Sequence, residues 1–343
     1  MPCIKLASNE NPFGPSPLAI EAIKAATSEA NLYPDHLVTE LRARLAELHD
    51  VELEQIMVTS GSTSFLDILA RTLLGPGLNA VTSKLSFIVY SLVTRATGAK
   101  FIEVPTRNDG YDLDGLLASL DDQTRMVYIA NPNNPTGTVL DASAVDRFLD
   151  RLPPHVTTVL DEAYCDYAGY FAIQRGMEYS HSLDYISRGR PVIVLRTFSK
   201  AHGLAGVRVG YGIGPAELIG YLERQKPMFQ VSSLAEGAAL AALADAEHVQ
   251  RAIENNAAGE RVLTQGLKEM GIKAGPTWAN FLFCRIGEDA RSLCRQLQEE
   301  GVIVRPLADA WGAPDALRVT IGTPRQNVQF LETLKRVRAR VPA

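Results

Sequence analysis

The composition of the chain is that of a globular protein with a sizeable core. It has 343 residues, of which 46% are hydrophobic and 21% charged, which fits one large domain and a smaller second one. The net charge of −5 without a basic stripe argues against nucleic acid as a partner, and no apolar run is long enough for a membrane span or a secretory signal. Four cysteines without a C-x-x-C pair favour neither zinc nor thioredoxin chemistry, so we expect a cytoplasmic protein without a metal.

Strand and helix patterns alternate through the first two thirds of the chain. Apolar residues recur at helical spacing over 64–74, and short β-rich runs lie before and after it. This alternation is typical of an α/β domain in which helices cover both faces of a mainly parallel sheet. The expected strands are 56–59, 99–105, 125–130, 156–160 and 191–197.

The pattern changes from about Ser232 onward. Two helical stretches, an Ala-rich one over 234–246 and a longer one over 249–270, are followed by short strands and a closing amphipathic helix over 328–341. We therefore expect a smaller α+β unit. Its predicted strands are 280–285, 302–305 and 317–321.

Polar residues follow four of the predicted strands at their carboxyl ends, the edge where open α/β sheets bind ligands. After the strand over 56–59, Gly61 permits a tight turn into a helix, whose free N–H groups and dipole attract an anion. Ser62 and Thr63 add hydroxyl donors, although the same string also suits an ordinary helix cap. After the strand over 125–130, a loop over 131–137 is stiffened by two prolines and supplies asparagine amides that can hold a ligand oxygen.

The strand over 156–160 leads into Asp161 and Glu162. Because successive residues of a strand point to opposite faces, we expect Asp161 to face the crevice and Glu162 to point away. A carboxylate at the end of a buried strand is costly unless it is paired. A pyridinium N–H at ~4 Å would attract it by roughly 4 kcal/mol at an effective dielectric constant near 20, enough to keep a pyridine nitrogen protonated near neutral pH. A structural salt bridge is the alternative.

The strand over 191–197 leads into a loop that contains Lys200 among small residues. Burial and a neighbouring cation such as Arg208 would lower the pKa of Lys200, so that its amine can attack a carbonyl group. Ser199 and Arg208 can also hold a phosphate. An exposed lysine on a turn is the alternative. The glycines over 210–214 have the wrong spacing for a dinucleotide-binding loop.

These strings resemble a known family. Fold-type-I pyridoxal-5′-phosphate (PLP) aminotransferases share N-P-N-N-P-T-G (131–137), D-E-A-Y (161–164) and T-F-S-K-A-H-G-L-A-G-V-R-V-G-Y (197–211), and the histidinol-phosphate aminotransferases among them share A-S-N-E-N-P-F-G-P-S-P (7–17) and L-R-V-T-I-G-T (317–323). The resemblance covers essentially the whole chain. It implies an aspartate-aminotransferase-like α/β fold with a mainly parallel seven-stranded sheet. On this basis we expect a large PLP-binding domain over 33–235 and a small α+β domain over 1–32 and 236–343.

The resemblance also implies residue roles. Lys200 would form the Schiff base with PLP and shuttle the substrate's α-proton, Asp161 would pair with the pyridine nitrogen, and Tyr164 would act at the ring 3′-oxygen. Lys200, Asp161 and Tyr164 are thus the expected catalytic residues, and all three also contact the cofactor. The further expected cofactor-binding residues are Asn134 at the 3′-oxygen, Phe87 against the ring, Ser62, Thr63, Ser199 and Arg208 at the phosphate, and Tyr33 from a neighbouring subunit. The expected substrate-binding residues are Asn9, Arg305 and Arg318.

The implied reaction transfers the amino group of histidinol phosphate to 2-oxoglutarate in histidine biosynthesis, in a homodimer with shared active sites. An aromatic amino acid as donor, a PLP lyase such as a threonine-phosphate decarboxylase, and a PLP-binding regulator with an attached DNA-binding segment are the alternatives. The sequence departs from the family pattern at Thr63 and Ser64, where acidic residues are usual, and at Phe87, where tyrosine is common. The chain also begins close to Asn9, which predicts a short N-terminal arm.

Overall fold

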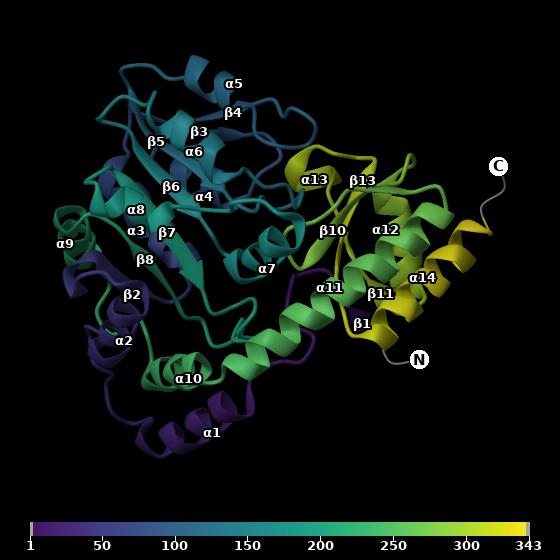
Figure 1. Ribbon diagram of the computed structural model, residues 1–343, viewed down its shortest axis with the longest axis horizontal. Helices are drawn as coiled ribbons and strands as arrows, with labels where there is room; N and C mark the ends of the chain where they lie inside the picture. Colours follow the sequence, from purple (N-terminus) through teal and green to yellow (C-terminus); the bar gives the residue numbers. More distant parts are fainter. Residues whose placement is uncertain (1–2, 341–343) are drawn as a thin grey trace.

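A seven-stranded sheet forms the centre of the larger of two units (Figure 1). The computed structural model describes residues 3–340. Strand β8 is antiparallel to both of its neighbours, and the other neighbouring pairs are parallel. The predicted mainly parallel seven-stranded sheet is therefore confirmed. In spatial order its strands are β2 (Ile56–Thr59), β8 (Gly210–Ile213), β7 (Val192–Thr197), β6 (Thr157–Asp161), β5 (Thr124–Ala130), β3 (Asn79–Ser83) and β4 (Lys100–Val104).

Helices cover both faces of this sheet because its strands are apolar on both sides. Along β7, for example, Ile193 and Leu195 pack on one face, whereas Val192 and Val194 pack on the other. The first face is covered by α3 (Ser62–Leu73), α4 (Val89–Ala96) and α9 (Ala216–Gln225). The second face is covered by α2 (Thr39–His49), α5 (Leu113–Ala118), α6 (Ala142–Leu149), α8 (Ser182–Ser187) and α10 (Ser233–Ala244). Short 3₁₀ turns at Thr27–Glu29 and Leu53–Gln55 complete the connections.

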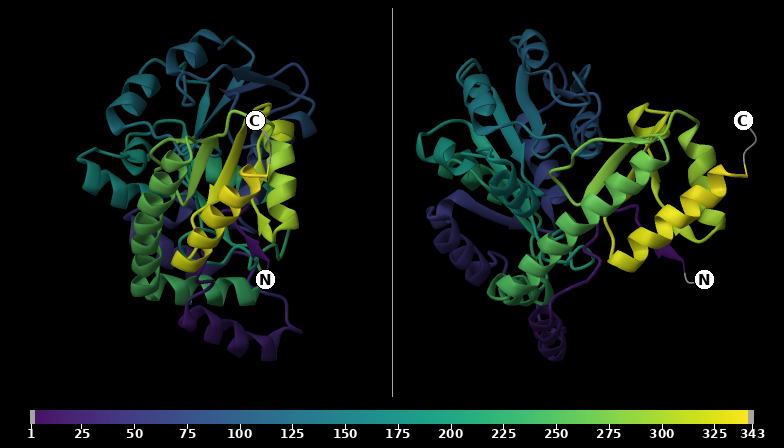
Figure 2. Two further views of the ribbon diagram at one scale, coloured as in Figure 1. Left: turned by 90° about the vertical axis from the view of Figure 1, so that its right-hand side faces the viewer. Right: turned by 45° about the vertical axis from the view of Figure 1, so that its right-hand side comes forward.

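The smaller unit is the predicted α+β arrangement, with its own hydrophobic core. Helix α11 (Ala246–Glu269) leads into it from the larger unit, and α7 (Cys165–Arg175) of the larger unit packs against this helix. Its antiparallel sheet has the order β12 (Arg305–Pro306), β13 (Ala316–Thr320), β10 (Phe281–Arg285) and β9 (Lys273–Ala274). The remaining elements are β1 (Ile4–Lys5), which pairs with β11 (Val302–Ile303), and the helices α12 (Ala290–Glu299), α13 (Ala308–Trp311) and α14 (Pro324–Arg338). Strand β1 and helix α14, which begin and end the described chain, both lie in this unit (Figure 2).

The structure corrects several sequence predictions. The five predicted strands of the large sheet agree with the structure to within one residue at either end, but β3 and β8 were not predicted. The single strand predicted over 302–305 is two short strands, because β11 pairs with β1 whereas β12 pairs with β13. The closing helix begins at Pro324, where the Thr323 side chain caps it, and ends at Arg338, before the predicted end at Val341, which itself lies outside the described residues.

Packing also assigns two helices differently from the predicted domain division. Helix α1 (Pro17–Ala26) packs against α10, and Ala19 lies in the larger core together with Ala238 and Ala242. Ile4 and Leu6 instead lie in the smaller core. The small side chains of α10 allow α1 to approach closely, so both helices belong with the larger unit on packing. No helix within residues 3–340 is long and apolar enough to cross a membrane.

The glycines of β8 have a packing role. A Cβ on Gly212 would lie 2.2 Å from the buried Phe65 ring of α3, and one on Gly210 would lie 2.7 Å from the Ser62 nitrogen. Because side chains two residues apart share a face, both glycines let α3 lie close against β8. This contact places the first residues of α3 at the edge of the sheet, beside the ends of β2 and β7.

We predict that Gly212→Ala lowers the free energy of unfolding by about 1–3 kcal/mol, because Phe65 is fully buried and cannot move without strain. Gly220→Ala in α9 is the matched control. Nothing lies within 4 Å of a Cβ at that position, so alanine should raise stability by up to about 1 kcal/mol. Urea unfolding of both variants measures the difference. Equal stability of Gly212→Ala and the unmodified protein would contradict the packing role.

Candidate active site

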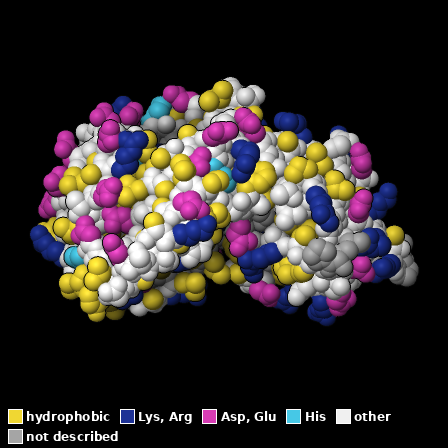
Figure 3. Space-filling model, turned by 90° about the horizontal axis from the view of Figure 1, so that it is seen from below, with side chains coloured by type: hydrophobic (Ala, Val, Ile, Leu, Met, Phe, Trp, Pro, Cys, Tyr) yellow, Lys and Arg dark blue, Asp and Glu magenta, His cyan; other side chains and the backbone are white. Residues whose placement is uncertain are grey.

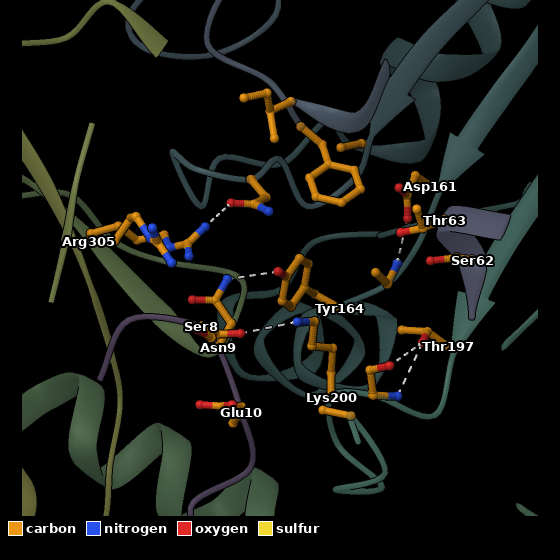
Figure 4. Close-up of a pocket in the computed structure, with 18 of the residues that line it drawn as sticks. Ser8, Asn9, Glu10, Ser62, Thr63, Asp161, Tyr164, Thr197, Lys200 and Arg305 are labelled. Atoms are coloured by element: carbon orange, nitrogen blue, oxygen red, sulfur yellow. Dashed lines mark hydrogen bonds between the residues drawn. The ribbon is translucent and has the colours of Figure 1, made fainter. Parts of the chain in front are cut away.

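A cavity of about 520 Å³ lies at the carboxyl ends of the central strands, between the two units. Residues from β5, β6 and β7 and their following loops line it from the larger unit, and residues of β12 and β13 line it from the smaller unit. Twelve of the thirteen predicted site residues line this one cavity, many of them visible in Figure 4. They are Asn9, Ser62, Thr63, Phe87, Asn134, Asp161, Tyr164, Ser199, Lys200, Arg208, Arg305 and Arg318.

One end of the cavity is built to hold an anion. Helix α3 begins there after Gly61, which has a φ of 83° and provides no side-chain cap. A Cβ on Gly61 would lie 2.7 Å from Nη2 of Arg208, so glycine is what lets the guanidinium lie against the turn. The helix dipole, the first backbone N–H groups of α3 and the arginine charge therefore act at the same place. The hydroxyl groups of Ser62, Thr63 and Ser199 line the same cavity.

Asp161 lines the cavity, as predicted, and Glu162 does not. The Asp161 carboxylate is buried and accepts hydrogen bonds from Tyr90 Oη at 2.9 Å and from the Ala163 backbone nitrogen at 3.2 Å. Glu162 instead pairs with Arg196 at 2.9 Å. Burial raises the pKa of Asp161 to about 6, with Tyr90 acting in the opposite direction. A cation placed against Asp161 would relieve the cost of burying its charge.

Lys200 approaches the middle of the cavity from the loop after β7 (Figure 4). Its Nζ lies 3.4 Å from the Ser8 carbonyl oxygen and 5.6 Å from the centre of the Tyr164 ring. Burial, followed by the charge of Arg318, lowers the pKa of Lys200 to about 8. About a tenth of the side chain is therefore a neutral amine at pH 7, far more than at the ordinary lysine pKa, and the neutral amine is the form that acts as nucleophile and base.

Two arginines face each other at the other end of the cavity. Arg305 of β12 and Arg318 of β13 are cross-strand partners, a position in which like charges destabilise a sheet. Arg305 is exposed at the cavity surface, whereas Arg318 is buried. Nη2 of Arg318 donates to the Ala7 carbonyl oxygen at 2.8 Å and Nη1 donates to Asn134 Oδ1, but Nε has no partner within residues 3–340. Burial lowers the pKa of Arg318 to about 10. An anion bound between the two guanidinium groups would supply the missing partner and reduce their repulsion.

Asn9 and Tyr164 connect the two units at the middle of the cavity. Asn9 Nδ2 donates to Tyr164 Oη at 2.8 Å, and the Asn9 backbone nitrogen donates to Thr320 Oγ1 at 2.9 Å. Asn9 has a φ of 57°, an uncommon conformation that such contacts must hold in place. Burial raises the pKa of Tyr164 to about 12, so its hydroxyl stays protonated and can donate a hydrogen bond.

Tyr33 is the predicted site residue that the cavity lacks. Its side chain is 83% exposed and its ring stacks on Phe229, with 4.6 Å between the ring centres.

Sequence reasoning also missed residues that shape the site. Tyr90 bonds Asp161, and Trp311 lines the cavity while its Nε1 donates to the Ser86 carbonyl oxygen at 2.7 Å. Tyr90 follows Phe87 by three residues, a helical spacing that could have indicated a shared role, whereas Trp311 carries no such signal.

Comparisons with known proteins agree with this geometry. Residues 1–334 match the family model described as aminotransferase class I and II. Histidinol-phosphate aminotransferase 2 of Pseudomonas fluorescens strain Pf-5 is 44% identical over 337 residues, which cover 98% of this chain and 89% of that protein. Histidinol-phosphate aminotransferase of Akkermansia muciniphila is 42% identical, with 97% of this chain and 90% of that protein covered.

Solved structures show the same fold. The structure of histidinol-phosphate aminotransferase from Sinorhizobium meliloti in complex with pyridoxal-5′-phosphate superposes with a TM-score of 0.91 at 28% identity, covering 99% of this chain and 92% of that one. A tetra mutant of aspartate aminotransferase from Thermus thermophilus gives a TM-score of 0.85 at 25% identity, covering 98% and 97% of the two chains. The chain therefore belongs to the family of class I and II aminotransferases, and its resemblance to the histidinol-phosphate aminotransferases is confirmed.

Proposed function

We propose that this protein is a PLP-dependent aminotransferase that transfers the amino group of histidinol phosphate to 2-oxoglutarate in histidine biosynthesis. One observation carries the proposal. A buried lysine with a lowered pKa lies in a single cavity between a helix N-terminus and a facing pair of arginines. The cavity therefore offers one place for a cofactor phosphate, one for a substrate anion and an amine between them. The names of the relatives, which are 42–45% identical, support the choice of substrate.

The residues of the cavity fit PLP. The start of α3, with Arg208 against Gly61, would hold the phosphate, and Asp161 would face the ring nitrogen. Phe87 would lie against the ring, which needs only an aromatic face. Asn134 and Tyr164 would hold the ring oxygen, since both line the cavity and carry hydrogen-bonding groups. When bound, PLP supplies an electron sink for the electrons released at the substrate's α-carbon.

Lys200 and Asp161 would then divide the chemistry. The neutral Nζ of Lys200 would act as the base that takes the proton from the substrate's α-carbon and as the acid that gives it back across the transferred nitrogen. The charged carboxylate of Asp161 keeps the ring nitrogen protonated. Hydrogen bonds from Arg318 to Asn134 and from Trp311 to Ser86 join the two units beside the cavity.

The facing arginines would select the donor. Arg305 and Arg318 together suit a phosphate dianion, and the same pair can bind a carboxylate of 2-oxoglutarate in the second half of the reaction. The two substrates would therefore occupy the site in turn.

A homodimer with shared active sites, located in the cytoplasm, is part of the same proposal. Tyr33 stacks on Phe229 at the surface, outside the cavity of its own chain. Leu32 and Met228, next to these two residues in sequence, are 61% and 67% exposed. Hydrophobic side chains also gather at one edge of the larger unit (lower left in Figure 3). Exposed apolar side chains of this kind mark an interaction surface, and a second copy that covers them would bring Tyr33 to its neighbour.

The direct test is a single-turnover titration of the PLP-loaded protein with histidinol phosphate or phenylalanine, followed by the visible absorbance of the bound cofactor. We expect histidinol phosphate to convert the cofactor at a much lower concentration than phenylalanine does. Conversion by phenylalanine with little response to histidinol phosphate would reassign the donor to an aromatic amino acid. Release of carbon dioxide without turnover of the keto acid would indicate a lyase.

We predict that Lys200→Ala lowers kcat by more than about 10³-fold, because no other amine lines the cavity within residues 3–340 to act as nucleophile and base. Stopped-flow measurement of the half-reaction gives the rate. Lys24→Ala is the control, since Lys24 is exposed and pairs only with Glu21. A Lys200→Ala variant that transaminates near the normal rate would remove Lys200 from the mechanism.

Asp161→Asn should have opposite effects on activity and stability. The folded-state pKa of Asp161 lies above its ordinary value of 3.8, so stability is lost as pH rises from about 4 through about 6, where the buried carboxyl group becomes charged. In the cofactor-free protein, asparagine removes this cost, and Tyr90 can accept from its amide. The free energy of unfolding should therefore rise by about 2–3 kcal/mol near pH 7.5 and change little near pH 4. Turnover should nevertheless fall strongly. Wild-type turnover in Asp161→Asn, or a lower free energy of unfolding than that of the unmodified protein near pH 7.5, would contradict the role given to Asp161.

Arg305→Ala should raise KM for histidinol phosphate by roughly 10- to 100-fold, because a charge-assisted contact to the phosphate is lost. We expect a smaller change in kcat, since Arg305 binds the substrate at a distance from the reacting carbon. Steady-state kinetics with varied donor measures both parameters. Arg336→Ala is the matched control, because Arg336 pairs with Glu300 outside the cavity. An unchanged KM in Arg305→Ala would place the phosphate elsewhere.

A further inference from the structure

Tyr90 lies behind the cavity and contacts two residues that line it. It is in the first turn of α4 and is fully buried. Its Oη donates to Asp161 Oδ2 at 2.9 Å, and its ring meets the Phe87 ring edge-on, with 5.5 Å between the centres and an interplanar angle of 89°. Tyr128 stacks on the Tyr90 ring, with 4.6 Å between the ring centres and an interplanar angle of 5°.

The Tyr90 hydroxyl is the one side-chain donor to Asp161 within residues 3–340, and the second donor is the Ala163 backbone nitrogen. A carboxylate that is held through both oxygens cannot rotate freely, so Tyr90 fixes the direction in which Asp161 presents its charge. A hydrogen bond to the charged form also opposes the effect of burial. The titratable or charged groups around Asp161 are Tyr90 from α4, Tyr111 from the loop before α5, Glu162 and Tyr164 from the segment after β6, and Lys200 from the loop after β7.

Phe87 depends on the same residue. Its ring faces the cavity and packs against the edge of Tyr90, which cannot move because Tyr128 and the Asp161 hydrogen bond hold it. Tyr90 therefore links the carboxylate that would face the cofactor's ring nitrogen to the aromatic ring that would lie against its face.

We propose that Tyr90 is a positioning residue for transamination, which acts through Asp161 and Phe87 to fix the orientation of the cofactor ring without touching it. The proposal rests on the assignment of Asp161 to the ring nitrogen made above. It adds a residue of the buried layer behind the cavity to the machinery of the reaction.

The chain offers a matched pair of variants for the test. Tyr90→Phe removes only the hydroxyl group and keeps the ring contact with Phe87. Tyr128→Phe removes an equally buried hydroxyl from the stacked neighbour, whose Oη lies 3.2 Å from Thr94 Oγ1 and makes no contact with Asp161. Both variants lose one buried phenol hydroxyl, so a general effect on packing should be similar in the two.

Loss of the donor raises the pKa of Asp161, so the acidic limb of the pH profile of kcat/KM should move to higher pH. For the PLP-loaded Tyr90→Phe protein, we expect a shift of about one pH unit, which lowers kcat/KM by up to about 10-fold on the acidic side of the limb. The shift should be absent in Tyr128→Phe. Thermal unfolding of both variants separates these effects from a loss of fold. If Tyr90→Phe does not fold, site-specific 3-fluorotyrosine at position 90 gives a stronger donor of nearly the same size and should move the limb to lower pH.

An acidic limb of the kcat/KM profile that stays unshifted in Tyr90→Phe, as in Tyr128→Phe, would overturn the proposal. An unshifted limb in the protein with 3-fluorotyrosine at position 90 would overturn it as well. The Asp161→Asn variant, measured alongside, distinguishes a wrong role for Tyr90 from a wrong assignment of Asp161. If Asp161→Asn is inactive while Tyr90→Phe resembles the unmodified protein, the role of Tyr90 is wrong and the proposed function stands. If Asp161→Asn retains full activity, the assignment of Asp161 is wrong and the role of Tyr90 falls with it.

Discussion

The buried carboxylate of Asp161 is the group on which the site depends. Burial raises its pKa to about 6, because one phenol hydroxyl and one backbone N–H compensate only in part for the water it has lost. Such a group destabilises the protein near neutral pH until a cation faces it, which gives the cavity an intrinsic preference for a protonated ring nitrogen. Glu162, the next residue, is buried as well but has Arg196 and Ser180 as partners. The same strand therefore ends in one satisfied carboxylate and one that requires a ligand.

The rest of the cavity carries positive charge and therefore requires anionic ligands. The start of α3 with Arg208 presents positive charge at one end, and the facing Arg305 and Arg318 present it at the other. Lys200 lies between these ends, and its pKa falls to about 8 through its burial among them. A small anionic cofactor and an anionic substrate would relieve all three positive regions at once. Since the arginine pair comes from the smaller unit and Lys200 from the larger, the site exists only where the two units meet.

Local sequence rules predicted the parts of the fold and site that local structure determines. The alternation of Asp161 and Glu162, the turn at Gly61 and the loop that presents Lys200 follow from residues adjacent in sequence. Strand β8 was missed because its two glycines, Gly210 and Gly212, lack β propensity, and they are required by the close approach of α3. The place of α1 beside α10, the contact of Trp311 with Ser86 and the bond from Tyr90 to Asp161 all join segments that are far apart in the chain. No periodicity or spacing encodes such contacts, so only the folded structure reveals them.

The central claim is that Asp161 keeps the ring nitrogen of bound PLP protonated. The most direct measurement is ¹⁵N NMR of the protein reconstituted with PLP labelled at the ring nitrogen, recorded across the pH range in which the protein is folded. We expect the chemical shift of a protonated pyridine nitrogen well above the pH at which free PLP loses that proton. A ring nitrogen that titrates as it does in free PLP would contradict this role of Asp161, because the carboxylate would then not hold the proton on the ring.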